Sequence, residues 1–166
     1  MPTVKLVGAD DGTVDGQLAA AQFTLFKYTA SATGTCSEVR IKCLQAGYAK
    51  VAVYADSAGV PGARLAKQDT STAVAAGWNT IALEASCSIV SGTAYWLAFV
   101  VDTSIFDYGT GTIPRYWTAV TYSTWTFPNP CPDVSGYGYM ANVLGYIAGW
   151  GTAAAAAGRS FGYIIG

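Results

Sequence analysis

Three aspartates near the start of the chain, Asp10, Asp11 and Asp15, lie in a glycine-containing stretch that could bind a cation. Carboxylate oxygens suit Ca²⁺, which takes about six to eight oxygen ligands. The spacing lacks the terminal glutamate of an EF-hand loop, so a metal-free Asp/Gly turn is the other interpretation. Asp102 and Asp107 form a second, weaker candidate. Calcium is the only cofactor that the residues suggest.

Catalytic chemistry has little support in the sequence. The chain has no histidine, the commonest general base, and no Gly-x-Ser-x-Gly motif. A glycosidase needs two carboxyl groups about 5 to 10 Å apart. The only glutamates, Glu38 and Glu84, alternate with apolar residues as on the outer face of a strand, where facing strands could pair them with Arg40 or Lys42. Residues 109–114 lack the last glycine of a phosphate loop. We therefore predict that the protein is not an enzyme.

Aromatic side chains are concentrated in the last third of the chain. Flat rings can stack on sugars, anchor a protein partner or fill a core. If residues 115–127 form one strand, its two tryptophans share a face and lie about 26 Å apart, at about 3.3 Å per residue, too far for one sugar platform. The aromatic binding candidates are Trp117, Trp125, Tyr116, Tyr122 and Trp150.

The four cysteines show no Cys-x-x-Cys spacing, and the chain has no histidine to complete a zinc site. An even count in an extracellular β-domain suggests disulfides, whereas buried free thiols are the alternative. If strand 36–44 pairs antiparallel with strand 78–88, one register places Cys36 opposite Cys87 and Cys43 opposite Thr80. Three pairings of the four cysteines are possible. The register favours a bridge Cys36–Cys87, and Cys43 would then face the core, where Cys131 could reach it from the proline-rich loop.

The composition is apolar and nearly uncharged. Apolar residues make up 52% of the chain and charged residues 11%, against about 25% charged in an average domain. This excludes a disordered chain. A net charge of −1 without a basic cluster argues against nucleic-acid binding. A surface with few charges repels neighbours weakly, which favours burial in an assembly.

No segment is typical of a membrane span or of a secretory signal. The longest weakly polar stretch, residues 145–158, is short and rich in glycine, whereas a span needs about 20 apolar residues. Residues 1–8 lack a basic region followed by a long apolar run. We expect either that a signal has been removed or that the chain leaves its cell as part of a particle. The expected location is extracellular or on a virion surface.

Alternation with period two dominates the pattern and predicts strands. Turn residues cluster at 10–16, 56–62 and 91–92. Residues 94–101 are almost continuously apolar, as in a central strand buried on both faces. The predicted strands of this part of the chain are residues 3–7, 21–28, 36–44, 49–55, 78–86 and 94–101.

The remaining third is less regular. Residues 102–114 are predicted as loop, 115–127 as a strand or hairpin, and 137–150 and 159–165 as closing strands. Three prolines exclude a central strand at 127–133. Residues 151–158 could form a helical turn or a loop. The whole pattern predicts an all-β fold, an antiparallel β-sandwich, jelly-roll-like, with about eight or more strands. We expect one domain over 1–166, from which segments 1–16 and 151–166 could extend.

One part of the chain resembles a known group of modules. The stretches are Val-Ala-Val-Tyr-Ala-Asp-Ser-Ala-Gly-Val-Pro-Gly-Ala-Arg-Leu-Ala at 51–66, Gly-Trp-Asn-Thr-Ile-Ala-Leu at 77–83 and Val-Ser-Gly-Thr-Ala-Tyr-Trp-Leu-Ala at 90–98. They resemble a motif of bacterial, archaeal and phage β-sandwich modules, similar to carbohydrate-binding modules and surface-anchored repeats. The resemblance covers residues 36–101 and implies a jelly-roll-like sandwich with a binding, adhesive or structural role. It assigns no binding residue.

Together these observations predict a non-catalytic structural or adhesive subunit of a virion or extracellular surface assembly, which associates with itself. The alternative is a monomeric carbohydrate-binding module that uses exposed aromatic residues. The partners expected are further copies of the chain and a glycan or cell-surface polymer, with no nucleic acid and no membrane insertion. Strands 3–7 and 159–165 are candidates for strand exchange between subunits, which needs a free edge.

Overall fold

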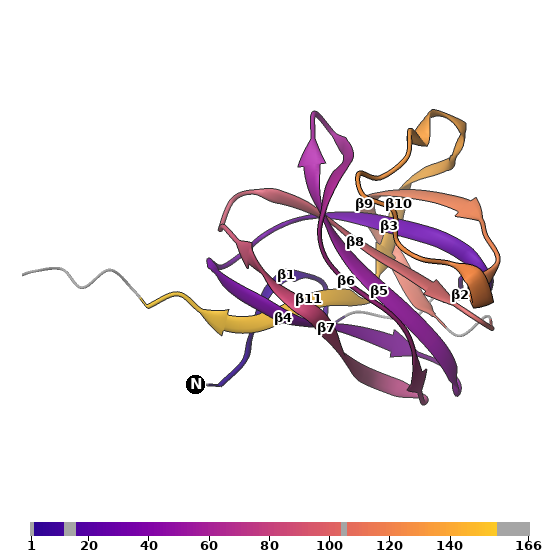
Figure 1. Ribbon diagram of the computed structural model, residues 1–166, viewed down its shortest axis with the longest axis horizontal. Helices are drawn as coiled ribbons and strands as arrows, with labels where there is room; N and C mark the ends of the chain where they lie inside the picture. Colours follow the sequence, from indigo (N-terminus) through magenta and orange to yellow (C-terminus); the bar gives the residue numbers. More distant parts are fainter. Residues whose placement is uncertain (1, 12–15, 104–105, 156–166) are drawn as a thin grey trace, which may run out of the picture.

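Two antiparallel sheets face one another in the computed structural model, which describes residues 2–11, 16–103 and 106–155 (Figure 1). The small sheet has the order β1-β11-β4-β7, and the large sheet has the order β10-β9-β3-β8-β5-β6 with β2 beside β9. The strands are β1 (Val4–Gly8), β2 (Gly16–Gln17), β3 (Gln22–Thr29), β4 (Gly34–Cys43), β5 (Gly47–Ser57), β6 (Val60–Val74), β7 (Gly77–Ile89), β8 (Ala94–Val101), β9 (Asp107–Ala119), β10 (Gly138–Gly145) and β11 (Ile147–Ala153). The predicted all-β antiparallel sandwich is confirmed, and its jelly-roll connectivity stays a prediction.

The main core lies between the two sheets and follows from the alternation. On β4, Val39 and Ile41 point inward and are fully buried, while the charged residues that alternate with them, Glu38, Arg40 and Lys42, face outward. On β8, every residue from Tyr95 to Val101 is buried, as the continuous apolar run predicts. Among the described residues, no helix is long and apolar enough to cross a membrane.

Two predicted loops are wrong, because glycine and proline are accommodated inside strands. The turn predicted at 56–62 is only Ala58–Gly59, whose φ angles of 52° and 93° suit a two-residue hairpin. The strand β6 therefore begins at Val60. Similarly, β9 runs through the predicted loop 102–114 from Asp107. Pro114 lies where the pairing of β9 with β10 shifts register, so its missing N–H breaks no regular ladder.

The end of the chain changes sheet. Residues 137–150, predicted as closing strand, contain β10 in the large sheet and β11 in the small sheet, with Tyr146 between them. β11 continues to Ala153, so the predicted loop or helical turn at 151–158 begins as strand. Residues 156–158 and the predicted strand 159–165 lie outside the described residues. β1 forms an edge of the small sheet, and strand exchange through it stays a prediction.

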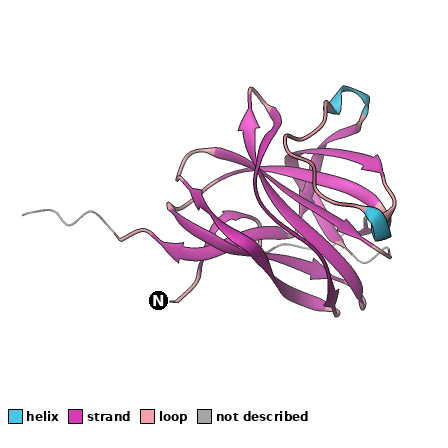
Figure 2. Ribbon diagram, viewed as in Figure 1, coloured by secondary structure: helices cyan, strands magenta, loops and turns pink. Residues whose placement is uncertain are grey.

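Residues 120–137, which we call the covering segment, connect β9 to β10 across the outer face of the large sheet. The segment contains two short 3₁₀ helices, Tyr122–Thr124 and Val134–Gly136, drawn in cyan in Figure 2. The prediction that 127–133 is no central strand is confirmed. The segment closes a second core, formed by Phe23, Leu25, Ala52, Tyr54, Trp96, Ala98, Val100, Phe127, Cys131 and Val134.

Hydrogen bonds from β5 hold the covering segment in place. Lys50 is 5% exposed, and its ammonium donates to the carbonyls of Tyr122 at 3.1 Å and Trp125 at 2.7 Å. The Tyr54 hydroxyl donates to the carbonyl of Pro128 at 2.9 Å. The Tyr122 carbonyl also accepts from the backbone N–H of Trp125 at 3.2 Å, whereas the carbonyls of Trp125 and Pro128 accept from the side chains of β5. Such side-chain donors help an irregular segment to meet its backbone hydrogen-bonding needs where it packs on a sheet.

Candidate functional site

A hollow of about 250 Å³ lies on the outer face of the small sheet, opposite the side that packs on the large sheet. Its lining residues are Asp10, Arg40, Trp78 and Trp150. They come from the turn after β1 and from β4, β7 and β11, which the sheet order brings together from both ends of the chain. Strand alternation turns Arg40 away from the core, since its neighbours Val39 and Ile41 are fully buried.

Arg40 is held at the centre of this hollow. Its guanidinium carbon lies 3.9 Å from the centroid of the Trp150 ring. Its Nε and Nη2 donate to Glu38 Oε1 at 2.9 and 2.6 Å, and Nη2 also donates to Thr3 Oγ1 at 3.2 Å. Trp78 is paired with Lys42 at the edge strand β7 and is 41% exposed. The hollow thus offers an ordered cation–π pair and a second, open indole face.

The charges of the hollow are paired within the chain. Arg40 forms its ion pair with Glu38, and Asp10 forms one with Lys5. The arrangement therefore presents flat apolar faces beside fixed hydrogen-bonding groups, without an unpaired charge among the lining residues. Such a mixture is typical of small-molecule sites.

Two of the four lining residues are among the site residues predicted from the sequence. Trp150 was an aromatic candidate and Asp10 a calcium candidate. Arg40 was considered only as a partner of Glu38, and Trp78 was not named as a site residue. The sequence does indicate that Trp78 is exposed, because the period-two alternation of strand 78–86 places its side chain on the solvent face. The sequence does not show which side chains lie beside it.

The proposed calcium ligands do not cluster within the described part of the chain. Asp10 pairs with Lys5, and Asp11 is exposed. Asp102 accepts a bond from the backbone N–H of Tyr48 at 2.8 Å. Asp15 and the side chain of Asp107 lie outside what the structure describes. Among the described residues, no group of three or more His, Cys, Asp or Glu could hold a metal ion, and calcium binding stays a prediction.

The two glutamates have structural partners. Glu38 pairs with Arg40, one of the two expected partners. Glu84 instead lies beside β6: its Oε1 accepts from the backbone N–H of Asp69 at 2.9 Å, and its Oε2 lies 3.7 Å from Lys67 Nζ, where Arg40 or Lys42 had been the expected partner. Both carboxylates therefore stabilise strands of the sandwich.

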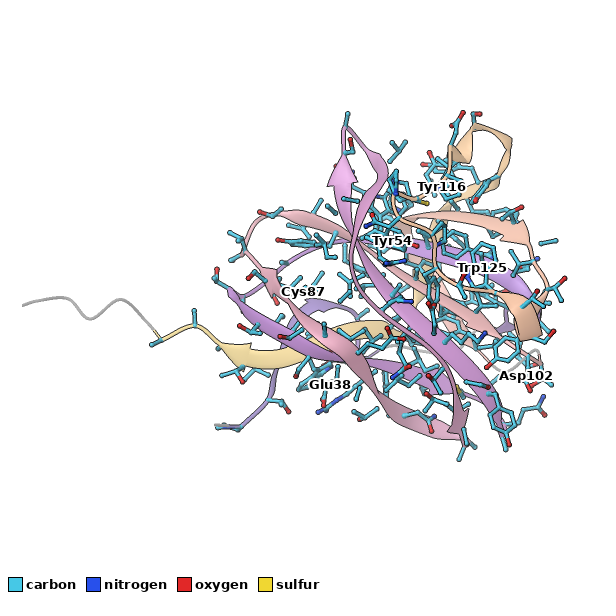
Figure 3. The ribbon with its side chains drawn as sticks, viewed as in Figure 1. Glu38, Tyr54, Cys87, Asp102, Tyr116 and Trp125 are labelled. Atoms are coloured by element: carbon cyan, nitrogen blue, oxygen red, sulfur yellow. The ribbon has the colours of Figure 1, made fainter. Side chains whose placement is uncertain are left out.

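The other aromatic candidates lie at the large sheet, as Figure 3 shows for Tyr116 and Trp125. Tyr116, Tyr122 and Trp125 pack against the second core. The Tyr116 ring lies 5.3 Å from Trp96, and the Trp125 ring lies 4.8 Å from Phe23. The predicted strand or hairpin at 115–127 is wrong, because β9 ends at Ala119 and a short 3₁₀ helix follows. The alternation of a strand therefore does not apply to Tyr122 and Trp125.

Trp117 lies neither at the hollow nor on the outer face of the large sheet. It follows Tyr116 on β9 and points to the opposite face, where the Arg115 guanidinium lies 4.3 Å from its ring centroid. The five aromatic candidates therefore do not form one surface.

All four cysteines are buried free thiols, so the predicted disulfides are not formed in the structure. Cys36 does lie opposite Cys87 between β4 and β7, as the predicted register requires. The Cys87 thiol, as a hydrogen-bonding partner, and burial together raise the pKa of Cys36. The structure therefore realises the buried-thiol alternative.

The second predicted bridge is also excluded by position. A register shift beyond Cys36 places Cys43 opposite Gly77 instead of Thr80. Cys43 faces the core between the sheets, whereas Cys131 belongs to the second core on the other side of the large sheet. Their thiols are thus separated by a sheet.

Comparison with known proteins finds no family for this chain: no protein-family model matches it, and no curated protein matches it. The function has to be inferred from the chemistry of the site.

Proposed function

We propose that the chain is a non-catalytic, adhesive β-sandwich subunit of an extracellular or virion surface and that it binds a neutral saccharide in the hollow of the small sheet. The fold and the low charge support the first part of this proposal, together with the resemblance of residues 36–101 to surface and carbohydrate-binding sandwich modules. The geometry of the hollow supports the second part.

The observation that carries the proposal is the pair of indoles beside a fixed guanidinium. Sugar rings present C–H faces that pack on flat aromatic rings, and their hydroxyls need donors and acceptors at the rim. Trp78 offers an exposed indole, while Arg40 and Asp10 offer a donor and an acceptor. The volume of about 250 Å³ suits one or two sugar units better than a large ligand.

The pairing of charges favours an uncharged sugar. An acidic ligand would compete with Glu38 for Arg40, and a basic ligand would compete with Lys5 for Asp10. Hydroxyl groups can instead add hydrogen bonds to ion pairs that stay intact. Since removing one partner of an ion pair is costly, a neutral saccharide fits the site best.

The test is a glycan array that holds neutral and acidic saccharides, followed by calorimetry on the best neutral ligand. We expect Trp78→Ala and Trp150→Ala to weaken binding about tenfold or more, equivalent to about 1.4 kcal/mol or more. Tyr48→Ala is the matched control, because Tyr48 is 49% exposed on β5 of the large sheet, away from the hollow. Binding only to acidic glycans, or equal losses in all three variants, would contradict the proposal.

A separate observation supports self-association, the other part of the expected role. β10 is an edge strand of the large sheet, and its neighbouring residues Tyr139 and Met140 are 53% and 42% exposed. An edge with unpaired backbone groups and apolar side chains is suited to pairing with a second copy. We propose that this edge joins subunits of the surface assembly.

Light scattering after size exclusion, over a range of concentrations, tests the association. The wild type is expected to form oligomers that the double variant Tyr139→Lys, Met140→Lys dissociates. Val90→Lys is the control, because Val90 is 51% exposed at the turn after β7. A wild-type monomer at all concentrations would exclude assembly through β10.

A further inference from the structure

Arg115 is a buried cation that has no carboxylate partner among the described residues. It is 5% exposed and lies on β9, facing the side of the large sheet that packs toward the small sheet. Its Nη2 donates to Gln22 Oε1 at 3.2 Å, and its Nη1 lies 3.8 Å from the weakly accepting Met140 Sδ. The Trp117 ring covers one face of the guanidinium.

A second buried polar atom without a partner lies next to it. In the described part of the chain, four buried side-chain atoms lack a hydrogen bond: Thr24 Oγ1, Arg115 Nε, Trp125 Nε1 and Trp150 Nε1. In the β3–β9 pairing, Thr24 is opposite Trp117 and Phe26 is opposite Arg115, so Thr24 and Arg115 are diagonal neighbours on one face. Thr24 is fully buried. Thr24 Oγ1 and Arg115 Nε therefore come from neighbouring residues on the same face of the large sheet.

Leaving these groups unsatisfied is costly. A buried charge without a counter-ion costs several kcal/mol, and a buried donor without an acceptor costs about 1–3 kcal/mol. Burial lowers the pKa of Arg115 to about 10, so the guanidinium stays charged at neutral pH. A water molecule could accept from Nε but could not compensate the charge, whereas an anion would do both.

We propose that Arg115 and Thr24 form a binding site for a small oxyanion, a carboxylate or a sulfate group. The Arg115 Nε–H and the Thr24 hydroxyl donate to oxygens of the anion. In a subunit whose β10 edge is not paired with a second copy, the ligand enters at the edge of the large sheet, where Met140 is 42% exposed and only weakly bonded to Arg115. Methionine is flexible, so the incoming oxygen can displace its sulfur.

This site is independent of the neutral-saccharide proposal. It lies on the large sheet, and its cation is unpaired, whereas the cation of the hollow is paired. The anion could be a free ion or the acidic group of a sugar, and both sources present the same oxygens to Arg115. Titration with both kinds of anion distinguishes the two sources. A negative result would not affect the proposal that the hollow binds a neutral saccharide.

The test observes the arginine Nε–H groups by ¹⁵N NMR while sodium acetate, sodium sulfate or sodium glucuronate replaces sodium chloride at constant ionic strength. The chain has four arginines, and Arg115→Met identifies the relevant signal by its loss. We expect this signal to shift saturably with acetate or sulfate and the Arg40 signal to stay constant. Thr24→Val, which keeps the shape of the side chain, should weaken binding about fivefold or more.

The titration has three outcomes that decide whether the anion site exists and which anion it binds. A saturable shift with equal affinity for acetate and glucuronate supports a free-ion site, and glucuronate binding about tenfold tighter supports an acidic sugar. No saturable shift with any of the three anions overturns the proposal. Should Arg115→Met fail to fold, the wild-type and Thr24→Val titrations still decide it, because unchanged affinity in Thr24→Val would exclude the two-residue site.

Discussion

The outer faces of the two sheets differ in what lies on them. The outer face of the large sheet carries aromatic residues such as Phe23 and Trp96, and the covering segment buries them completely. The outer face of the small sheet carries the charged residues of β4 between Trp78 on β7 and Trp150 on β11. No described segment covers the hollow that these residues line. The same residue types therefore fill a core on one face and line a surface on the other.

The difference shows that an aromatic-rich stretch has no fixed role by itself. Tyr122 and Trp125 could be taken for ligand contacts from sequence, yet their own segment folds them onto the large sheet. A covering segment needs apolar surface to pack on and partners for its backbone groups, and Lys50 and Tyr54 supply donors to three of its carbonyls. On the outer face of the small sheet, Arg40 and Asp10 are engaged in their own ion pairs and no described segment lies over the hollow, so Trp78 is open to a ligand.

The largest expected effect is on the covered face. Phe127 is 1% exposed, and its ring lies 5.8 Å from that of Phe23. Phe127→Ala leaves a cavity under the covering segment and should lower the free energy of unfolding by about 3–5 kcal/mol. Urea unfolding measures this loss. A loss below about 1 kcal/mol would mean that the covering segment contributes little to stability.

A smaller loss is expected when the anchor of the covering segment is removed. Lys50→Met removes the donor to the Trp125 carbonyl and one of the two donors to the Tyr122 carbonyl, which should cost about 1–3 kcal/mol. The Cys131 thiol reports whether the segment opens. Burial raises its pKa to about 12, so only about 10⁻⁴ of the molecules carry a thiolate there at pH 8 and alkylation is slow.

In Lys50→Met, we expect Cys131 to be alkylated faster, while Cys36 and Cys43 keep their wild-type rates because they lie in or at the core between the sheets. Mass spectrometry of the labelled peptides gives the four rates separately. Equal acceleration at all four cysteines would indicate global destabilisation and would remove the distinction between the two cores.

An acid titration tests the rim of the covered face. Burial alone would raise the pKa of Asp56, but bonds from Lys27 Nζ at 3.0 Å and Trp96 Nε1 at 2.8 Å outweigh it and lower that pKa. The stability from this carboxylate is therefore complete above its unfolded pKa of about 3.9 and is lost as the pH falls through the lower folded pKa. Asp56→Asn should cost about 1 kcal/mol at pH 7.

The difference in unfolding free energy between wild type and Asp56→Asn should shrink as the pH decreases from 5 to 2. Urea unfolding at fixed pH values measures it. A difference that stays constant over this range would show that the ionised carboxylate is not what ties Asp56 to Lys27 and Trp96.

Period-two alternation was sufficient to predict the regular strands β3, β4, β5, β7 and β8, because each has a buried face or is buried throughout. It missed β6, where exposed and half-buried positions prevail and Pro61 and Gly62 indicate a turn. It missed the first half of β9 for a similar reason, since glycines and Pro114 hide the strand. Local patterns fail where long-range pairing overrides local preference.

Individual residues of the hollow could be predicted from the sequence, but their convergence could not. The outward positions of Trp78 and Arg40 follow from alternation, and Trp150 was named from its residue type. Their convergence depends on the order β11-β4-β7, in which a strand from the end of the chain lies beside two from the first half. A single sequence carries no signal for that order. The role of the covering segment was hidden for the same reason.

The smallest expected effect on stability comes from the uncovered face, and it is the sharpest test of the comparison. Trp78 is 41% exposed on an edge strand, so Trp78→Ala should change the free energy of unfolding by about 0.5 kcal/mol or less. The same substitution should weaken saccharide binding, because it removes an indole face of the hollow. Urea unfolding and calorimetry on one preparation measure both quantities. A stability loss near that of Phe127→Ala would mean that Trp78 contributes to the packing of the sandwich. The aromatic residues on the two outer faces would then both have a structural role.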